Sequence, residues 1–303
     1  LVYTLSLHDA LPISVEVWAF RALLLDARPP VEQVVADATP ETVTYRRLSA
    51  TELLADDHLL RQAFGLLVLA HYRTEPADLA RLLDAPNVTV RALTHDDHVV
   101  AVALLAREGG LDAATRERMD AGERVRGNMV PDVLTTQLRD SEAGVPVGQR
   151  VLRIATHSAV RSRGLGSRLL AELRADFADD VDWLGVGYGA TPELVRFWRA
   201  NGYGLVHLST TRNDTSGEYS AVMLDPCSAS GRRLATRHAE WFCARIGSWP
   251  ACHAARRCWI RTPTRCDGSP SGISSPPTTP TRWPTARSAC SSERRCRPGR
   301  GSR

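Results

Sequence analysis

The 303-residue sequence contains no lysine, so all 38 of its basic side chains are arginines. A Walker A phosphate-binding loop needs a lysine directly after its glycines, because the ammonium group contacts the nucleotide phosphates. The chain therefore excludes an ATP site of this type.

Cysteine is absent from the first 226 residues, and all seven cysteines lie at or after Cys227. None belongs to a C-x-x-C pair, so the usual spacing of zinc ligands is missing and we predict no metal. The cysteine-free body gives no sign of an oxidising compartment, and we expect a cytoplasmic protein. Long apolar runs are missing too, so we expect no membrane association.

The formal net charge of +4 hides an uneven distribution along the chain. Residues 248–303 carry 11 arginines against two acidic residues, whereas residues 1–247 carry 27 arginines against 32 acidic residues. Nucleic-acid affinity depends on clustered cations, so the acidic body by itself is a poor surface for RNA.

Both ends of the chain differ in composition from the rest. Residues 1–13 have neither the basic start nor the continuous apolar segment of a signal peptide, and we interpret them as translated sequencing adapter. Residues 248–303 are rich in Arg, Cys, Ser, Pro and Thr, contain no Leu, and show no helical or strand period. We interpret them as a frameshifted, disordered tail; a natural basic disordered arm is the alternative.

Between these ends, the apolar periodicity predicts alternating helices and strands. The expected elements are helices over 59–72 and 76–86, a strand hairpin over 88–108, a helix over 126–140, a strand over 151–156, a helix over 165–177, a strand over 182–189, a helix from Pro192 to just before Gly202, and a strand hairpin over 203–226. Thr191 is the predicted N-cap of the helix that begins at Pro192. This order indicates an α/β fold with a mixed central sheet flanked by helices.

A glycine-containing loop joins the strand at 151–156 to the helix at 165–177. Such a loop aims backbone N–H groups and a helix N-terminus at one place, which favours a phosphate. A Rossmann fingerprint fails because Leu169 stands where the third glycine is needed. Arg161, Gly164 and Gly166 instead match the [Q/R]-x-x-G-x-[G/A] signature of the GNAT acetyltransferases, which bind coenzyme A. Glycines that only allow close packing at a helix entry are the alternative.

Several further blocks, in order along the chain, carry a more specific resemblance. They read FGLLVLAHYRTEPADLARLLDAPN, LLAREGGL, RGNMVPDVL, RIATH followed by RSRGLGSRLL, and GATPELVRFW followed by GYGLVHLSTTRNDTSGEYSAVMLDP. Over about residues 15–247 the chain resembles the tRNA(Met) cytidine acetyltransferase family, especially its haloarchaeal members. The resemblance implies a GNAT fold, acetyl-CoA as donor, and acetylation of the N4 amine of cytidine in RNA, with the tRNA(Met) wobble cytidine as the type substrate. In that family an ATP-hydrolysing, helicase-like module assists; we expect no ATP or magnesium site in this chain.

The resemblance also implies functional residues. The coenzyme-binding positions are Ile154, Ala155, Thr156, Arg161, Ser162, Arg163, Gly164, Leu165, Gly166, Ser167 and Glu193. A further arginine contact of some members falls on Ala200 and is not carried over. The catalytic candidates are His71, whose imidazole could take a proton near neutral pH, and Arg153, which could bind phosphate, coenzyme or RNA. A structural histidine and a surface salt bridge are the respective alternatives.

Two further histidine-containing stretches lie in expected loops. His157 lies beside the glycine loop, with no role assigned by pattern. His95, Asp96, Asp97 and His98 have the side chains of metal ligands, but they occupy the expected hairpin turn, where solvated polar residues are common. We interpret this group as a turn.

The resemblance divides the chain into five segments. Residues 14–47 are expected to be the end of the ATPase module or a linker, residues 48–226 the acetyltransferase domain, and residues 227–247 the start of an RNA-binding region, between the adapter-derived residues 1–13 and the tail 248–303. The function we expect is RNA cytidine acetylation by a fragment without its ATPase module. A GNAT enzyme acting on a protein or small-molecule amine, and an inactive acetyl-CoA-binding remnant, are the alternatives.

Overall fold

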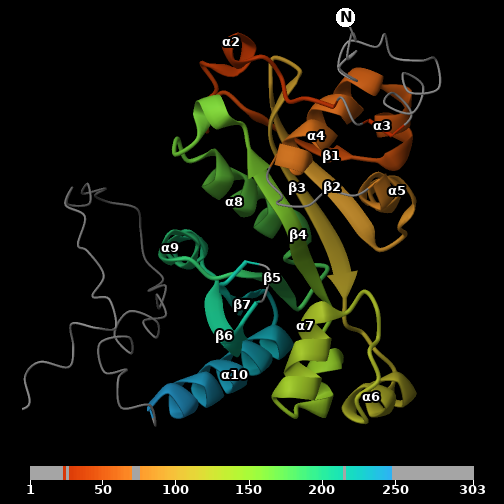
Figure 1. Cartoon of the computed structure of the whole chain (residues 1–303), viewed down its shortest axis with the longest axis vertical. Helices are drawn as coiled ribbons and strands as arrows, with labels where there is room; N and C mark the ends of the chain where they lie inside the picture. The colour runs from red at the N-terminus through yellow and green to blue at the C-terminus, as the bar shows by residue number, and fades with distance from the viewer. Residues whose placement is uncertain (1–22, 25–26, 70–75, 214–215, 248–303) are drawn as a thin grey trace, which may run out of the picture. The chain divides into compact units, whose positions relative to one another are not determined.

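Seven strands form one mixed sheet in the order β1-β2-β3-β4-β5-β7-β6 (Figure 1). The computed structural model describes residues 23–24, 27–69, 76–213 and 216–247. The strands are β1 Thr44–Leu48, β2 Val88–His95, β3 His98–Glu108, β4 Gly148–Thr156, β5 Trp183–Gly189, β6 Gly204–Arg212 and β7 Tyr219–Pro226. All neighbouring strands are antiparallel except β4 and β5, which are parallel.

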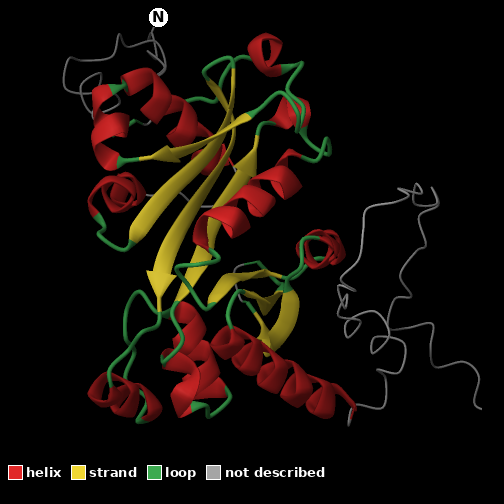
Figure 2. Cartoon of the chain, turned by 180° about the vertical axis from the view of Figure 1, so that it is seen from behind, coloured by secondary structure: helices red, strands yellow, loops and turns green. Residues whose placement is uncertain are grey.

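Helices cover both faces of this sheet (Figure 2). The α-helices are α2 Glu32–Val35, α3 Ala50–Ala55, α4 Asp57–Leu69, α5 Pro76–Asp84, α6 Ala113–Asp120, α7 Met129–Asp132, α8 Leu165–Phe177, α9 Pro192–Ala200 and α10 Ala229–Gly247. A π-helical turn, η2 (Val133–Gln137), continues α7, and two 3-10 turns are η3 (Ser141–Gly144) and η4 (Ser158–Val160). Every helix in the described ranges is too short or too polar to cross a lipid bilayer.

Three apolar clusters assign the helices to the two faces. The first cluster joins α8 and α9 to one face of the sheet. On the other face, the second cluster joins α3, α4 and α5 to strands β1 to β4, and the third joins α7 and α10 to β5, β6 and β7. Strand β3 is buried on both faces from Val99 to Ala106, which explains its unbroken apolar run.

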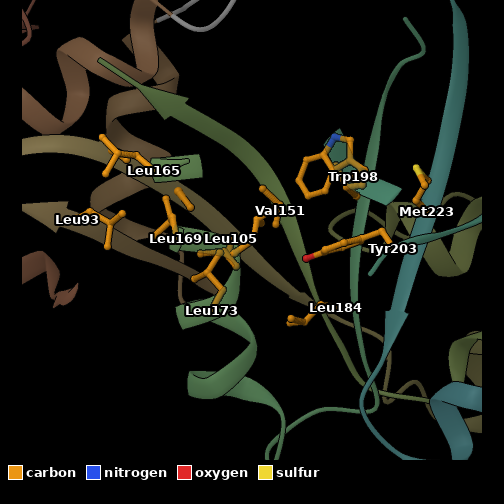
Figure 3. Close-up of a cluster of buried hydrophobic side chains, with 14 of the residues drawn as sticks. Leu93, Leu105, Val151, Leu165, Leu169, Leu173, Leu184, Trp198, Tyr203 and Met223 are labelled. Atoms are coloured by element: carbon orange, nitrogen blue, oxygen red, sulfur yellow. The ribbon is translucent and has the colours of Figure 1, made fainter. Parts of the chain in front are cut away.

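Helix α8 shows how local sequence produces this packing. Its buried Leu165, Leu169 and Leu173 recur at i+4 spacing and form one stripe along the helix. Figure 3 shows these leucines facing Leu93 and Leu105 of the sheet. Burial of each such side chain is worth about 2 kcal/mol relative to exposure, so the stripe holds the N-terminus of α8 firmly in place.

The sequence predicted most of these elements. The helix over 165–177, the two strand hairpins, and the helix that begins at Pro192 are confirmed, and Thr191 Oγ1 accepts from Leu194 N as the N-cap. The strand expected over 151–156 begins three residues earlier, at Gly148. Strand β1 pairs with β2, so the sheet includes residues just before the expected domain start at residue 48. The helices α3, α6 and α10 were not predicted.

Candidate functional site

The parallel strands β4 and β5 stay together only at their beginnings. Residues Gly148–Val151 of β4 pair with Trp183–Val186 of β5, and beyond this point β4 pairs only with β3 and β5 only with β7. The register of β4 against β3 skips Leu152, which is a β-bulge. A bulge bends its strand, so it accounts for the separation. The edge of β4 from Leu152 to Thr156 that faces β5 thus has no strand partner among the described residues.

The helix that follows β4 begins without a side-chain cap. Its N-cap is Gly164, with φ of +89°, and no side chain bonds to the first turn. Arg168 N donates to Gly164 O at 2.9 Å and is the first N–H group that donates within the helix, so the N–H groups of Leu165, Gly166 and Ser167 have no acceptor inside the helix. Three N–H groups with the positive end of the helix dipole attract an anion such as a phosphate.

The two arginines of the loop have different surroundings. Arg163 Nη1 donates to the carbonyl oxygen of Ala36, which ties the loop to the segment before β1. Arg161 is exposed, and within the described residues no hydrogen bond or ion pair engages its guanidinium group. Ser162 between them has φ of +61°, in the left-handed region that non-glycine residues seldom adopt. Arg161 is therefore the cation of this loop that is available to a phosphate.

Three elements meet at Gly166. A Cβ atom added there would lie 3.3 Å from the ring of Phe197 on α9 and 3.7 Å from Thr156 Oγ1 on β4. The open edge of β4, the start of α8 and the aromatic face of α9 thus surround the same small space. Phe197 is not recognisable as a site residue from the sequence, because an aromatic residue on an amphipathic helix is more often part of the core.

Glu193 lies in the first turn of α9 and is exposed. A hydrogen bond from its own backbone N–H lowers the pKa of the carboxyl group, and Arg196, 3.2 Å away, acts in the same direction. Its carboxylate is thus available to a ligand at the edge of this site. Within the described ranges, neither a hydrogen bond nor an ion pair joins Glu193 to the glycine loop.

The catalytic candidates are placed differently. His71 lies outside the described residues. Arg153 lies on the face opposite α8, where its Nη2 forms an ion pair of 2.6 Å with Asp78 Oδ2 of α5. Only 10% of the Arg153 side chain and 12% of the Asp78 side chain are exposed, so the pair is nearly buried. Arg153 therefore connects α5 to the bulged part of β4 and does not extend toward the glycine loop.

His157 has a structural place beside the loop. Its Nδ1 accepts from Ala159 N at 3.2 Å, and its Nε2 lies 2.9 Å from Pro30 O. This pattern requires the neutral tautomer with a proton on Nε2, which donates to Pro30 O. His157 caps η4 and anchors residues 28–31 near the glycine loop.

The turn between β2 and β3 holds no metal-binding group in the described part of the chain. Asp96 and Asp97 have φ of +47° and +64°, as in a type I′ hairpin turn. His98 Nδ1 lies 3.1 Å from the amide nitrogen of the buried Gln62, which also contacts His58. No group of three or more potential ligands that could hold a metal lies within the described residues.

Comparison with known families and proteins agrees with this geometry. The GNAT acetyltransferase 2 family model matches residues 62–178 and 168–228, which together include the splayed strands and the glycine loop. The chain is 77% identical over 240 residues to the tRNA(Met) cytidine acetyltransferase TmcA of Haloarcula marismortui, covering 79% of this chain and 31% of that protein. It is 75% identical over 233 residues to the protein of the same name from Haloferax volcanii, covering 77% of this chain and 31% of that protein.

Among solved structures, one similar chain is the ribosomal-protein-S18-alanine N-acetyltransferase from Escherichia coli. It shows 16% sequence identity and a TM-score of 0.41, with 61% of this chain and 94% of that chain covered. The present chain spans 31% of the length of each of the two curated relatives named above.

Proposed function

Because the chain belongs to the GNAT acetyltransferase 2 family, we propose that it is the acetyltransferase part of a longer RNA-modifying enzyme. The reaction is transfer of the acetyl group of acetyl-CoA to the N4 amine of cytidine in RNA. The names of its relatives point to tRNA(Met) as the substrate. We also propose a cytoplasmic location.

One observation carries the coenzyme assignment: the uncapped start of α8 lies beside a strand edge that has no partner. The N–H groups of residues 165–167 and the guanidinium group of Arg161 suit the pyrophosphate of coenzyme A. The free edge of β4 suits the amide-rich pantetheine arm, which can bond to it as a strand would. Together these features fit an elongated ligand with an anionic end.

When bound, acetyl-CoA supplies an acetyl group that is activated as a thioester. The residues of this chain hold it, with Phe197 and Thr156 beside Gly166 at the start of α8. Backbone N–H groups along the open edge of β4 can donate to a carbonyl oxygen, which is the usual way to stabilise negative charge during acyl transfer. His71, Arg153 and Glu193 remain functional candidates from the family resemblance.

The experiment has two stages and uses the full chain. Isothermal titration calorimetry is expected to show binding of acetyl-CoA and CoA, and a coupled assay is expected to show no ATP hydrolysis. Absence of CoA binding contradicts the proposal. The lack of lysine simplifies radiolabel transfer from acetyl-CoA, because the protein has no lysine amines to become acetylated.

The second stage tests the acceptor. We expect little RNA acetylation by the chain alone, since its body is acidic. A chimera in which the matched 240 residues replace those of the Haloarcula marismortui relative should restore N4-acetylcytidine on tRNA, measured by mass spectrometry. Acetylation of peptides or polyamines but not RNA supports a different GNAT activity. CoA binding without any transfer supports a non-catalytic remnant.

A further inference from the structure

Strand β5 presents a row of glycines on one face. Gly185, Gly187 and Gly189 alternate along the strand, so their missing side chains all belong to the same side. The residues between them, Val186 and Tyr188, belong with the cluster beneath α8. The glycine row therefore lies on the face opposite α8, together with α7 and the Arg153–Asp78 pair.

Side chains from other residues occupy the space above these three glycines. The ring of Trp183 lies over Gly185, where a Cβ would be 2.7 Å from Trp183 Cζ3. The Cε atom of Met129 on α7 occupies the position of a Cβ on Gly187, and the carboxylate of Glu218 occupies that of a Cβ on Gly189. Glycine at the last position thus lets the Glu218 carboxylate lie directly on the strand.

Glu218 is partly buried, and none of the described residues pairs with its carboxylate. Its backbone is held in the β6–β7 turn, where its carbonyl oxygen accepts from Asn213 N at 2.8 Å. Within the described residues, its carboxylate makes no hydrogen bond or ion pair, whereas the buried carboxylates of Glu108 and Asp176 are paired with arginines. The carboxylate oxygens of Glu218 can accept hydrogen bonds and are not engaged by another described residue, so Glu218 is a candidate for binding a ligand that carries a hydrogen-bond donor.

The position of Glu218 relative to the two strands suggests which ligand. Strands β4 and β5 separate after Val186, and Gly189 lies three residues further, about 10 Å along the strand. The proposed coenzyme site is at the start of α8, on the other face of the sheet. Glu218 lies on the face that α8 and α9 do not cover, so an acceptor that reaches the gap from that face meets the Glu218 carboxylate.

We propose that the Glu218 carboxylate binds the exocyclic amine of the acceptor base and selects cytosine over uracil. The proposal rests on the proposed function. Cytosine presents an N4–H₂ donor, to which a carboxylate accepts a hydrogen bond. Uracil presents a carbonyl oxygen at the same place, which a carboxylate repels because neither group can donate. Glu218 is thereby an acceptor-binding residue that holds the amine at the open end of the gap.

The test measures base preference in the full chain saturated with CoA. Cytidine and uridine are titrated separately, and their dissociation constants are obtained from ligand-observed NMR. The wild-type chain is expected to prefer cytidine by about tenfold or more, which corresponds to about 1.4 kcal/mol. Glu218→Ala is expected to reduce this ratio to about one.

Glu218→Gln provides a second, nearly isosteric variant. A glutamine amide can accept from the cytosine amine or donate to the uracil oxygen, so uridine should now bind about as well as cytidine. Glu117→Gln on α6, where Glu117 is exposed, is the matched control and should keep the wild-type preference. The CoA affinity and the melting temperature should stay unchanged in all three variants.

The outcomes separate this assignment from the proposed function. If the wild-type chain does not bind CoA, the proposed function itself fails. If it binds CoA but shows no preference for cytidine, or if both Glu218 variants keep the preference, the role of Glu218 is overturned and the coenzyme assignment is untouched.

Discussion

At the scale of single residues, the start of α8 depends on backbone conformations that few side chains tolerate. Gly164 has φ of +89°, where glycine has no steric penalty, and Ser162 has φ of +61° without that freedom. Residues held in such conformations cost about 1–3 kcal/mol each and persist where the surrounding structure supports them. Here the bond from Arg163 to Ala36 and the His157 cap provide that support.

Gly166 provides the residue-scale prediction. Gly166→Glu places a side chain and a negative charge between Phe197 and the N–H groups of α8, so we expect CoA affinity to fall by tenfold or more. Calorimetric titration with CoA checks this. Ala175→Glu adds the same charge at an exposed site on α8, about 13 Å along the helix, and should change the affinity little. Equal affinities in the two variants would remove the start of α8 from the coenzyme site.

At the scale of elements, the nine residues of β4 form three parts with different structural roles. Its first four residues hold β5, the bulge at Leu152 turns the strand away, and the remaining residues leave one edge free. The same bulge places Arg153 on the face of α5, where Asp78 fixes it. The position of α5 is thus coupled to the bend that opens the site.

A double-mutant cycle tests this coupling. Arg153→Gln removes one ion-pair partner of Asp78, which also pairs with Arg81 at 2.8 Å, and Asp78→Asn removes the carboxylate that pairs with the nearly buried Arg153. Each change should lower the free energy of unfolding by about 1–3 kcal/mol. The free energy of unfolding should fall less in the double variant than the sum of its decreases in the two single variants. The expected difference, which is the coupling energy, is about 1 kcal/mol or more. Urea unfolding measures these differences. The exposed pair Arg118–Glu123, at 3.4 Å, is the control and should couple by less than about 1 kcal/mol.

The same variants distinguish two roles of Arg153. If Arg153 acts only through the ion pair, Asp78→Asn and Arg153→Gln should reduce acetyl transfer in the chimera by similar factors. Loss of transfer in Arg153→Gln alone, with normal transfer in Asp78→Asn, would show that Arg153 contacts the coenzyme or the RNA directly.

At the scale of the whole molecule, α10 closes the part of the sheet that carries β6 and β7. Leu234 of α10 joins the cluster of Val206, Val222 and Leu224, whereas Phe242 joins the cluster beneath α8. His207 of β6 is 5% exposed and lies beneath this helix. Burial, aided by the positive charge of Arg245 and by His238, lowers the pKa of His207 to about 4.

This burial predicts an acid-sensitive stability. The unfolded chain binds a proton at His207 near pH 6.5, whereas the folded chain does so only near pH 4. The stabilising contribution of neutral His207 to the free energy of unfolding is therefore fully present above pH 6.5. It is lost progressively as the pH falls from 6.5 to 4, and the loss is at most about 3 kcal/mol. In His207→Leu, the free energy of unfolding should depend less on pH between 6.5 and 4, as measured by urea titration at several pH values. An unchanged slope in that variant would contradict the assignment.

Asp140, whose carboxylate contacts His238, titrates in a lower pH range than His207. Burial acts to raise the pKa of Asp140, but hydrogen bonds from His238 and Arg237 outweigh it and lower the pKa below the ordinary value of 3.8. The stability due to Asp140 is thus kept until the pH falls below about 4.

Local patterns alone determined the elements around the site. The apolar stripe of α8, the Thr191–Pro192 start of α9 and the alternating hairpin strands are visible in sequence, because each follows from neighbours a few residues apart. The Arg161-x-x-Gly164-x-Gly166 pattern likewise predicted a phosphate-binding loop. Strand β1 and helix α10 escaped prediction, since short or weakly periodic segments become regular only when a sheet or core stabilises them.

The tertiary structure alone brought distant residues together. No spacing in the sequence predicts that the bulge at Leu152 separates β4 from β5, that Asp78 holds Arg153, or that Glu218 lies on Gly189. These contacts join residues that are 29 to 75 positions apart in the chain. They depend on strand register and on which face each side chain occupies, and a change of one residue in register would move every side chain of a strand to the other face.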